Sequence, residues 1–118
     1  MSFFFSIVCG MYPSLTANKD YYVYMTYDLH GQWDADNIFV NPGCANGNCL
    51  RSHVNKTETE YTLAMITKAG IPSNKVVPGL ALYGRSFEMT DPSCKGPTCT
   101  FTGTRTHSNA IHGECTDT

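Results

Sequence analysis

One helical segment between two apolar runs constrains the fold of this chain more than any other feature. The apolar runs are residues 21–27 (YYVYMTY) and 76–83 (VVPGLALY), and the segment between them contains TETEYTLAMITKAGIP, whose apolar residues have helical spacing. Neither run alternates clearly, which is typical of strands buried on both faces of a parallel sheet. The order strand, helix, strand therefore predicts a βαβ unit, whose crossover is right-handed in nearly all proteins.

Both ends of the helix are marked in the sequence. The pattern predicts a helix over residues 57–69, with Thr57 as the N-cap and Glu60, three residues later, completing a capping box. Gly70 suits the position just after the helix, and Pro72 stops it. The expected apolar face consists of Tyr61, Leu63, Ala64, Met65, Ile66 and Ala69.

Polar side chains follow both predicted strands. Asp28 comes directly after the first strand, and Arg85 follows the second. Because the carboxyl ends of parallel strands meet at one edge of a sheet, where α/β proteins bind their ligands, we expect these two side chains to lie close together. Trp33, the only tryptophan of the chain, follows Asp28 within five residues, and His30 is expected to order the loop near Asp28.

Composition narrows the possible partners. The 118 residues are 42% hydrophobic and 15% charged with a formal net charge of −2, which suits one modest folded domain. Without a basic stripe, the sequence predicts no nucleic-acid or anionic-membrane partner, and it favours neutral ligands. The four histidines follow no metal-ligand spacing, so we predict neither a metal site nor a cofactor.

Six cysteines are many for this length. Two close pairs each enclose four residues, and no CxxC spacing for zinc occurs, so local disulfides in an oxidising compartment are expected. The pairing stays open, because six cysteines allow 15 connectivities. The disulfide candidates are Cys44, Cys49, Cys94, Cys99 and Cys115, while Cys9 has no assigned role. Asn55 begins an N-glycosylation sequon, which fits secretion.

Composition also divides the chain. Residues 1–20 are poorly assigned: their apolar core lacks the preceding basic residue of a signal peptide, and it is too short to span a membrane. Residues 28–56 form a long loop that needs a staple or a function. Residues 88–118 are rich in Gly, Pro, Thr and Ser and resemble an inserted loop region. The expected division is 1–20, 21–87 and 88–118.

The stretches MTYDLHGQWD, TETEYTLAMITKAGIPSNKVV and GLALYGRSF resemble glycoside hydrolase family 18 chitinases, and CKGPTCTFTG with GECT is similar to the fungal killer-toxin-like subgroup. The resemblance covers about residues 20–118. It implies a (β/α)8 TIM barrel in which residues 21–27 are strand six, residues 76–83 are strand seven, and residues 88–118 open an α+β insertion. Since such a barrel needs about 250 residues, the chain would be a C-terminal-half fragment holding a quarter to a third of it.

The same resemblance implies a substrate site. The matching positions are Met25, Tyr27, Asp28, Trp33, Tyr83 and Arg85. In this family the N-acetyl group of the substrate attacks its own anomeric carbon, so the protein must hold that group and protonate the leaving oxygen. The acid of the family lies in a D-x-x-D-x-D-x-E motif that this sequence does not contain, so no catalytic residue is assigned.

Three functions follow as hypotheses. The first is a secreted chitinase that cleaves β-1,4 links between N-acetylglucosamine units, of which this chain would be an inactive and poorly soluble part. The second is a chitin-binding lectin-like module without catalysis. The third is a small secreted disulfide module with an unrelated role. The expected partners are chitin or N-acetylglucosamine oligomers, and the oligomeric state is left open.

Overall fold

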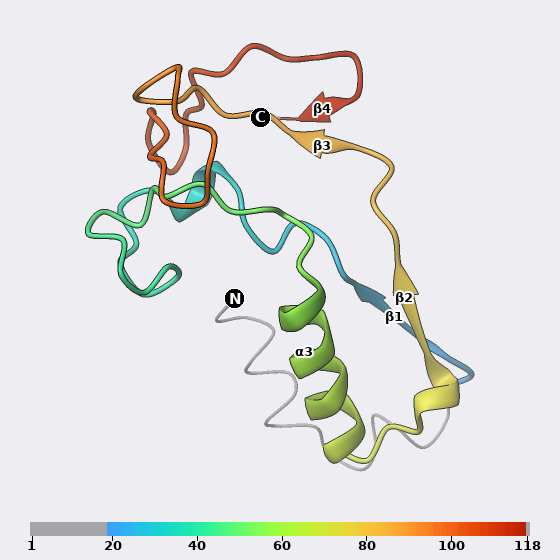
Figure 1. Ribbon diagram of the computed structural model, residues 1–118. Coiled ribbons are helices and arrows are strands. Elements are labelled where there is room, and N and C mark those ends of the chain that lie inside the picture. Colours follow the sequence, from blue (N-terminus) through green and yellow to red (C-terminus); the bar gives the residue numbers. More distant parts are fainter. Residues whose placement is uncertain (1–18, 118) are drawn as a thin grey trace. The chain divides into compact units, whose positions relative to one another are not determined.

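The computed structural model describes residues 19–117 (Figure 1). They form two compact units, one from residues 19–27 with Asn55–Leu80 and the other from Asp28–Val54 with residues 81–117. Cys9 and almost all of the poorly assigned segment 1–20 lie outside the described residues. Within residues 19–117, no helix is long and apolar enough to cross a membrane.

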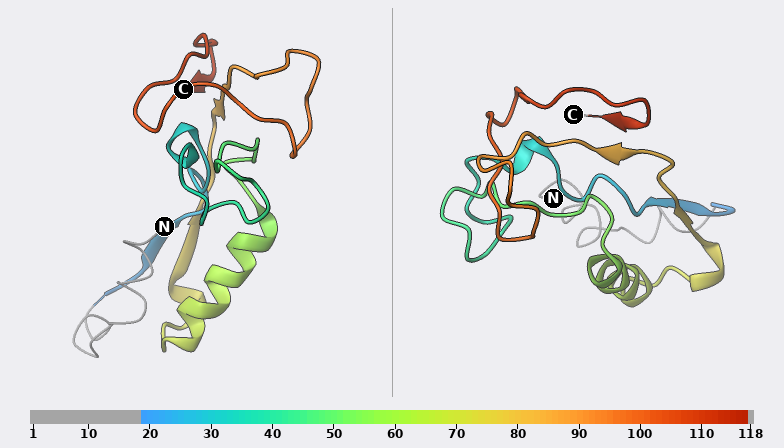
Figure 2. Two further views of the ribbon diagram at one scale, coloured as in Figure 1. Left: turned by 90° about the vertical axis from the view of Figure 1, so that its left-hand side faces the viewer. Right: turned by 45° about the horizontal axis from the view of Figure 1, so that its top comes forward.

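The first unit is the predicted βαβ arrangement. Strands β1 (Tyr22–Met25) and β2 (Val76–Gly79) pair in parallel, with Tyr22 opposite Val76 and Met25 opposite Gly79. Helix α3 (Lys56–Lys68) connects them and runs alongside the pair, and the short 3-10 helix η2 (Ser73–Lys75) leads into β2 (Figures 1 and 2). The prediction of two parallel strands joined by a helix is therefore confirmed.

The core of this unit lies between the sheet and α3. Its buried residues are Tyr24, Ile66 and Ile71, with Tyr22, Leu63 and Val76 packed against them. The expectation that both faces of the strands are buried was wrong, because Val23 is 62% exposed and Val77 is 48% exposed. Side chains of a strand alternate between its faces, and in this unit α3 covers the face that carries Tyr24.

The N-cap of the helix lies two residues earlier than predicted. Asn55 is the N-cap, and its side-chain oxygen accepts a hydrogen bond from the Glu58 N–H at 3.2 Å. Asparagine is at least as good an N-cap as threonine. Asn55, which comes earlier in the chain, therefore caps the helix in place of Thr57. The prediction for the other end holds, since Gly70 has φ of 92° just after the helix. Tyr61, expected on the apolar face, is exposed.

The second apolar run forms a shorter strand than predicted. Strand β2 ends at Gly79, and Leu80 and Leu82 are 83% and 95% exposed rather than buried. The end of β1 explains this stop, because the Thr26 hydroxyl donates to the Gly79 carbonyl at 2.5 Å. A side chain at Gly79 would also stand 3.1 Å from the Tyr27 ring.

The second unit has little regular structure. It contains the 3-10 helix η1 (Gln32–Asp34) and a parallel pair of two-residue strands, β3 (Gly84–Arg85) and β4 (Thr116–Asp117), visible in Figure 2. Isolated bridges connect the long loop to the later segment, for example Cys49 with Thr100. The buried Phe101 ring packs 4.9 Å from that of Phe87.

Two disulfides hold this unit together. Cys44 bonds to Cys49, and Cys94 bonds to Cys99, so the two close pairs predicted as local disulfides are confirmed. Among the described residues, Cys115 is a free and exposed cysteine and does not join them. The first bridge closes a turn of the long loop 28–56, which supplies the staple that this loop was expected to need.

Candidate functional site

The candidate site lies in the second unit and is centred on Asp28. Strand β1 ends at Met25, Thr26 and Tyr27 follow it, and Asp28 comes next. Asp28 has φ of 57°, in the left-handed region that few residues other than Gly, Asn and Asp adopt. This backbone turn ends the extended course of the chain. It starts the loop that contains η1.

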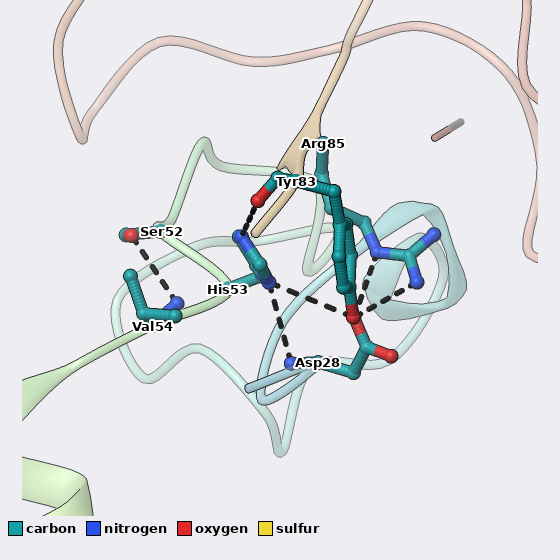
Figure 3. A network of polar contacts seen from close by, with 6 residues as sticks. All are labelled: Asp28, Ser52, His53, Val54, Tyr83 and Arg85. Atoms are coloured by element: carbon teal, nitrogen blue, oxygen red, sulfur yellow. Dashed lines mark hydrogen bonds and ion pairs between the residues drawn. The ribbon is translucent and has the colours of Figure 1, made fainter. Parts of the chain in front are cut away.

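Three donor groups converge on one oxygen of Asp28 (Figure 3). The Tyr83 hydroxyl donates to Oδ1 at 2.5 Å, and Arg85 donates to the same atom from Nε at 3.1 Å and from Nη2 at 2.8 Å. Arg85 is held by its place in β3, and its side chain is only 10% exposed. The expected meeting of Asp28 and Arg85 is thus confirmed, as a direct ion pair.

The contacts set the ionisation of both partners. Partial burial raises the pKa of Asp28, but the hydrogen bonds from Tyr83 and Arg85 and the positive charge of Arg85 outweigh it, so the pKa lies below its usual 3.8. Burial, followed by the hydrogen bond to Asp28 and its negative charge, raises the pKa of Tyr83. At neutral pH the cluster therefore holds a carboxylate, a neutral phenol and a guanidinium.

Trp33 lies beside Arg85 in the same cluster. The Arg85 guanidinium carbon lies 4.8 Å from the centroid of the indole ring and 5.5 Å from that of Tyr83, within the range of a cation–π contact. Gly31 lets the indole fold back on its own chain, because a Cβ there would overlap the ring. The tryptophan remains 36% exposed and can offer ring surface to a ligand.

Hydrogen bonds of three buried residues, His30, Gln32 and Asp34, hold the short helix η1 that carries Trp33. Gln32 donates from its amide nitrogen to the carbonyls of Thr102 and Thr104 at 3.0 and 3.1 Å. His30 and Asp34 form a buried pair at 2.7 Å. His30 therefore orders this loop through Asp34.

His53 also belongs to the group of Asp28, Trp33, Tyr83 and Arg85, and we call these five residues the Asp28 cluster. It is the one member that the sequence did not reveal. Its ring is buried beside Asp28 and Tyr83 (Figure 3), and its carbonyl accepts from the Leu29 N–H at 3.0 Å. The residue comes from the irregular part of loop 28–56, where no periodicity or motif marks it.

Four of the six predicted substrate residues are brought together in this unit, namely Asp28, Trp33, Tyr83 and Arg85. The other two belong to the first unit. Met25 ends β1 and is 43% exposed, and the Tyr27 ring packs against Gly79.

Comparison with known proteins gives consistent matches. The model of glycosyl hydrolases family 18 matches residues 6–115. Secreted chitinase LysM12 of Penicillium expansum is 65% identical over 99 residues, which are 84% of this chain and 7% of that protein. Killer toxin subunits alpha/beta of Kluyveromyces lactis are 43% identical over 82 residues, 70% of this chain and 6% of that protein.

A plant protein extends the range of these matches. Class V chitinase CHIT5a of Medicago truncatula is 34% identical over 87 residues, 72% of this chain and 21% of that protein. The chain therefore spans a small part of the length of each of these relatives. No solved structure matches it.

Proposed function

The chain belongs to glycosyl hydrolases family 18, and from this premise we propose that the Asp28 cluster is part of the chitin-binding site of a secreted chitinase. The family implies a TIM-barrel-type fold. In our proposal residues 21–87 supply two neighbouring strands of such a barrel, and residues 88–118 begin an insertion. Residues 1–20 keep no assigned role.

One observation carries the proposal. Tyr83 and Arg85 both donate to Oδ1 of Asp28, and within residues 19–117 no hydrogen bond or ion pair reaches Oδ2 (Figure 3). The Asp28 side chain is 27% exposed. A fixed carboxylate with one oxygen still able to accept suits a sugar hydroxyl or an acetamide N–H, and the neighbouring indole suits the apolar face of a sugar ring.

The roles of the individual residues are those that the family motif implies. Tyr27 and Asp28 would hold the N-acetyl group in line with the anomeric carbon, since substrate-assisted cleavage depends on that orientation. Met25 would lie under the same sugar, and Trp33 would stack on a neighbouring one. Tyr83 and Arg85 would add hydrogen bonds and keep Asp28 charged. The assignments of Met25 and Tyr27 depend on the family motif.

Proton donation is the missing part of this chemistry. The 118 residues contain no D-x-x-D-x-D-x-E sequence. A positioned general acid contributes about 10²- to 10⁴-fold to the rate. We therefore propose that these residues bind N-acetylglucosamine oligomers but do not cleave them by themselves. A chitin lectin would show the same behaviour, so it remains the alternative function.

The location of the protein follows the same reasoning. Two disulfides fit an oxidising compartment, and we place the protein outside the cell. Asn55 would be glycosylated there. Its Oδ1 caps α3, and a glycan on the amide nitrogen would leave that oxygen in place.

Binding of an N-acetylglucosamine tetramer to the purified chain tests the site. We expect the fluorescence of Trp33, the only tryptophan, to change on binding. Asp28→Ala should abolish this change, whereas Asp91→Ala should not, because Asp91 is exposed and bonded to Ser93. Trp33→Ala has no tryptophan left, so its expected loss of binding is measured by isothermal titration calorimetry with wild type as the reference. A wild-type chain that does not bind the tetramer would contradict the proposed site.

A chimera separates the chitinase from the lectin. In Secreted chitinase LysM12, the 99 matching residues can be replaced by those of this chain. Retained turnover of the tetramer would support a chitinase segment, and loss of turnover with retained binding would support the lectin. Turnover by the 118-residue chain alone would contradict our assignment of the missing acid.

A further inference from the structure

We propose that His53 is a positioning residue of the Asp28 cluster: its imidazole ties the main chains at Asp28 and Tyr83 together and so fixes the carboxylate that receives the saccharide. The inference rests on the proposed function. It assigns no proton transfer to His53.

The ring of His53 bridges two segments that are far apart in the sequence. Asp28 N–H donates to Nδ1 at 3.4 Å, and Nε2 lies 3.1 Å from the Tyr83 carbonyl oxygen. The ring also packs against the Tyr83 ring, with centroids 5.1 Å apart and an interplanar angle of 32°. Both ring nitrogens thus have main-chain partners, as Figure 3 shows. With 7% of the residue exposed, little of the ring faces solvent.

These partners define the tautomer. An N–H group can only donate, so Nδ1 must be the unprotonated acceptor opposite Asp28. A carbonyl can only accept, so the hydrogen must be on Nε2 opposite Tyr83. These two contacts assign the ring hydrogen to Nε2 and the acceptor role to Nδ1. A doubly protonated ring would lose the bond to the Asp28 amide.

The bonds of His53 act on the main chain at Asp28, whose conformation is left-handed. The left-handed conformation of Asp28 is disfavoured for residues with a side chain and persists where the surroundings hold it. His53 holds two consecutive amides, that of Asp28 through Nδ1 and that of Leu29 through its carbonyl at 3.0 Å. Its Nδ1 also lies 3.6 Å from Oδ1 of Asp28. The direction of the carboxylate is thus coupled to the placement of one imidazole.

A preorganised site binds more tightly than one that must be ordered on binding. If His53 supplies that order, removing either bond should loosen Asp28 against Tyr83 and Arg85 and weaken saccharide binding. The two bonds can be removed separately. Asn carries its carbonyl oxygen at the position of Nδ1, and Gln carries its amide nitrogen at the position of Nε2.

The test compares the full chain with His53→Asn, His53→Gln and His53→Ala, using the N-acetylglucosamine tetramer and Trp33 fluorescence. We expect about a 3- to 10-fold loss of affinity in each of the first two variants, as one hydrogen bond is lost, and a larger loss in His53→Ala. His107→Gln, at an exposed histidine, should bind like wild type. Equal affinities of wild type and all three His53 variants would overturn the proposal.

A second measurement is independent of ligand. The ¹⁵N shifts of the His53 ring in the wild-type chain should show a hydrogen on Nε2 and none on Nδ1 at neutral pH. The opposite tautomer would overturn the proposal even if the variants do not fold. Failure of the tetramer to bind wild type would instead contradict the proposed function, while the ring shifts still decide the position of His53.

Discussion

At the scale of single residues, Asp28 organises the candidate site. It accepts from a phenol and a guanidinium on one oxygen and has an imidazole against its main chain. The carboxylate is partly exposed, so water screens the ion pair and its contribution to stability is small. The arrangement fixes the orientation of the carboxylate, because Tyr83, Arg85 and His53 leave it little freedom to turn.

The lowered pKa of Asp28 gives a prediction with a definite sign. The ionised form is favoured in the folded chain, so its stabilisation is present above pH 3.8 and is lost as the pH falls through the folded-state pKa. We expect tetramer binding to decline in the same range. A carbon NMR titration of the Asp28 carboxyl should show a midpoint below 3.8 in the wild type.

Removal of one donor provides the control for that titration. Tyr83→Phe deletes the hydroxyl that donates to Asp28, while the ring that packs on His53 stays. The Asp28 midpoint should then rise, and that of Asp91, whose pKa is lowered by Ser93, should not change. A midpoint for Asp28 above 3.8 in the wild type would contradict the described cluster.

At the scale of elements, α3 shows how a local signal can be read almost correctly. The spacing of the apolar residues located the helix to within one residue at each end. The predicted N-cap was wrong because Asn55 and Thr57 are both good capping residues and both precede the apolar stripe. Only the main-chain course decides which side-chain oxygen meets a free N–H.

The two candidate caps allow a matched prediction. Asn55→Ala should destabilise α3 by about 1 kcal/mol, because the Glu58 N–H loses its acceptor. Thr57→Ala, within the first turn, should have a much smaller effect. Amide hydrogen exchange along α3 measures both. Faster exchange in Thr57→Ala than in Asn55→Ala would show that the cap is placed wrongly.

The burial of the strands was harder to predict from the sequence than the position of the helix. Their parallel pairing followed from the intervening helix, but their burial did not. Val23, Val77 and Leu82 are as apolar as buried strand residues, yet they are exposed. Burial depends on what packs against each face, and that is a property of the neighbours rather than of the strand.

At the scale of the whole molecule, the two compact units are stabilised differently. The unit with α3 has an apolar core, whereas the unit with the Asp28 cluster contains both disulfides, many turns and the buried contact of Phe101 with Phe87. Each disulfide joins cysteines five residues apart, and chain entropy predicts about 2 kcal/mol for a loop of that size. The site is therefore built on the unit that reduction would loosen.

Cysteine chemistry tests this description. Without reduction, iodoacetamide should modify Cys115, and peptide mapping should recover Cys44 linked to Cys49 and Cys94 linked to Cys99. After reduction, amide exchange should accelerate across the unit that holds the disulfides, while α3 keeps its protection. Protection of Cys115 from the reagent would contradict its description as a free cysteine.

The sequence by itself determined the helix and the parallel strand pair, because each depends on residues that are near in the chain or on a general rule of connection. It favoured local disulfides in the two close cysteine pairs but left the pairing open, and the structure decided it. The sequence also predicted that Asp28 and Arg85 would meet, since parallel strands end at one edge. These features need no knowledge of what else packs against them.

Tertiary structure alone decided which strand face is covered, that Tyr83 and Arg85 share one oxygen of Asp28, and that His53 joins them. His53 lies 25 residues from Asp28 and 30 from Tyr83 in an irregular loop. No periodicity extends over such a loop, so its path depends on the sum of many weak contacts. The physical reason is that a hydrogen bond depends on positions within tenths of an ångström, and only the folded chain sets these.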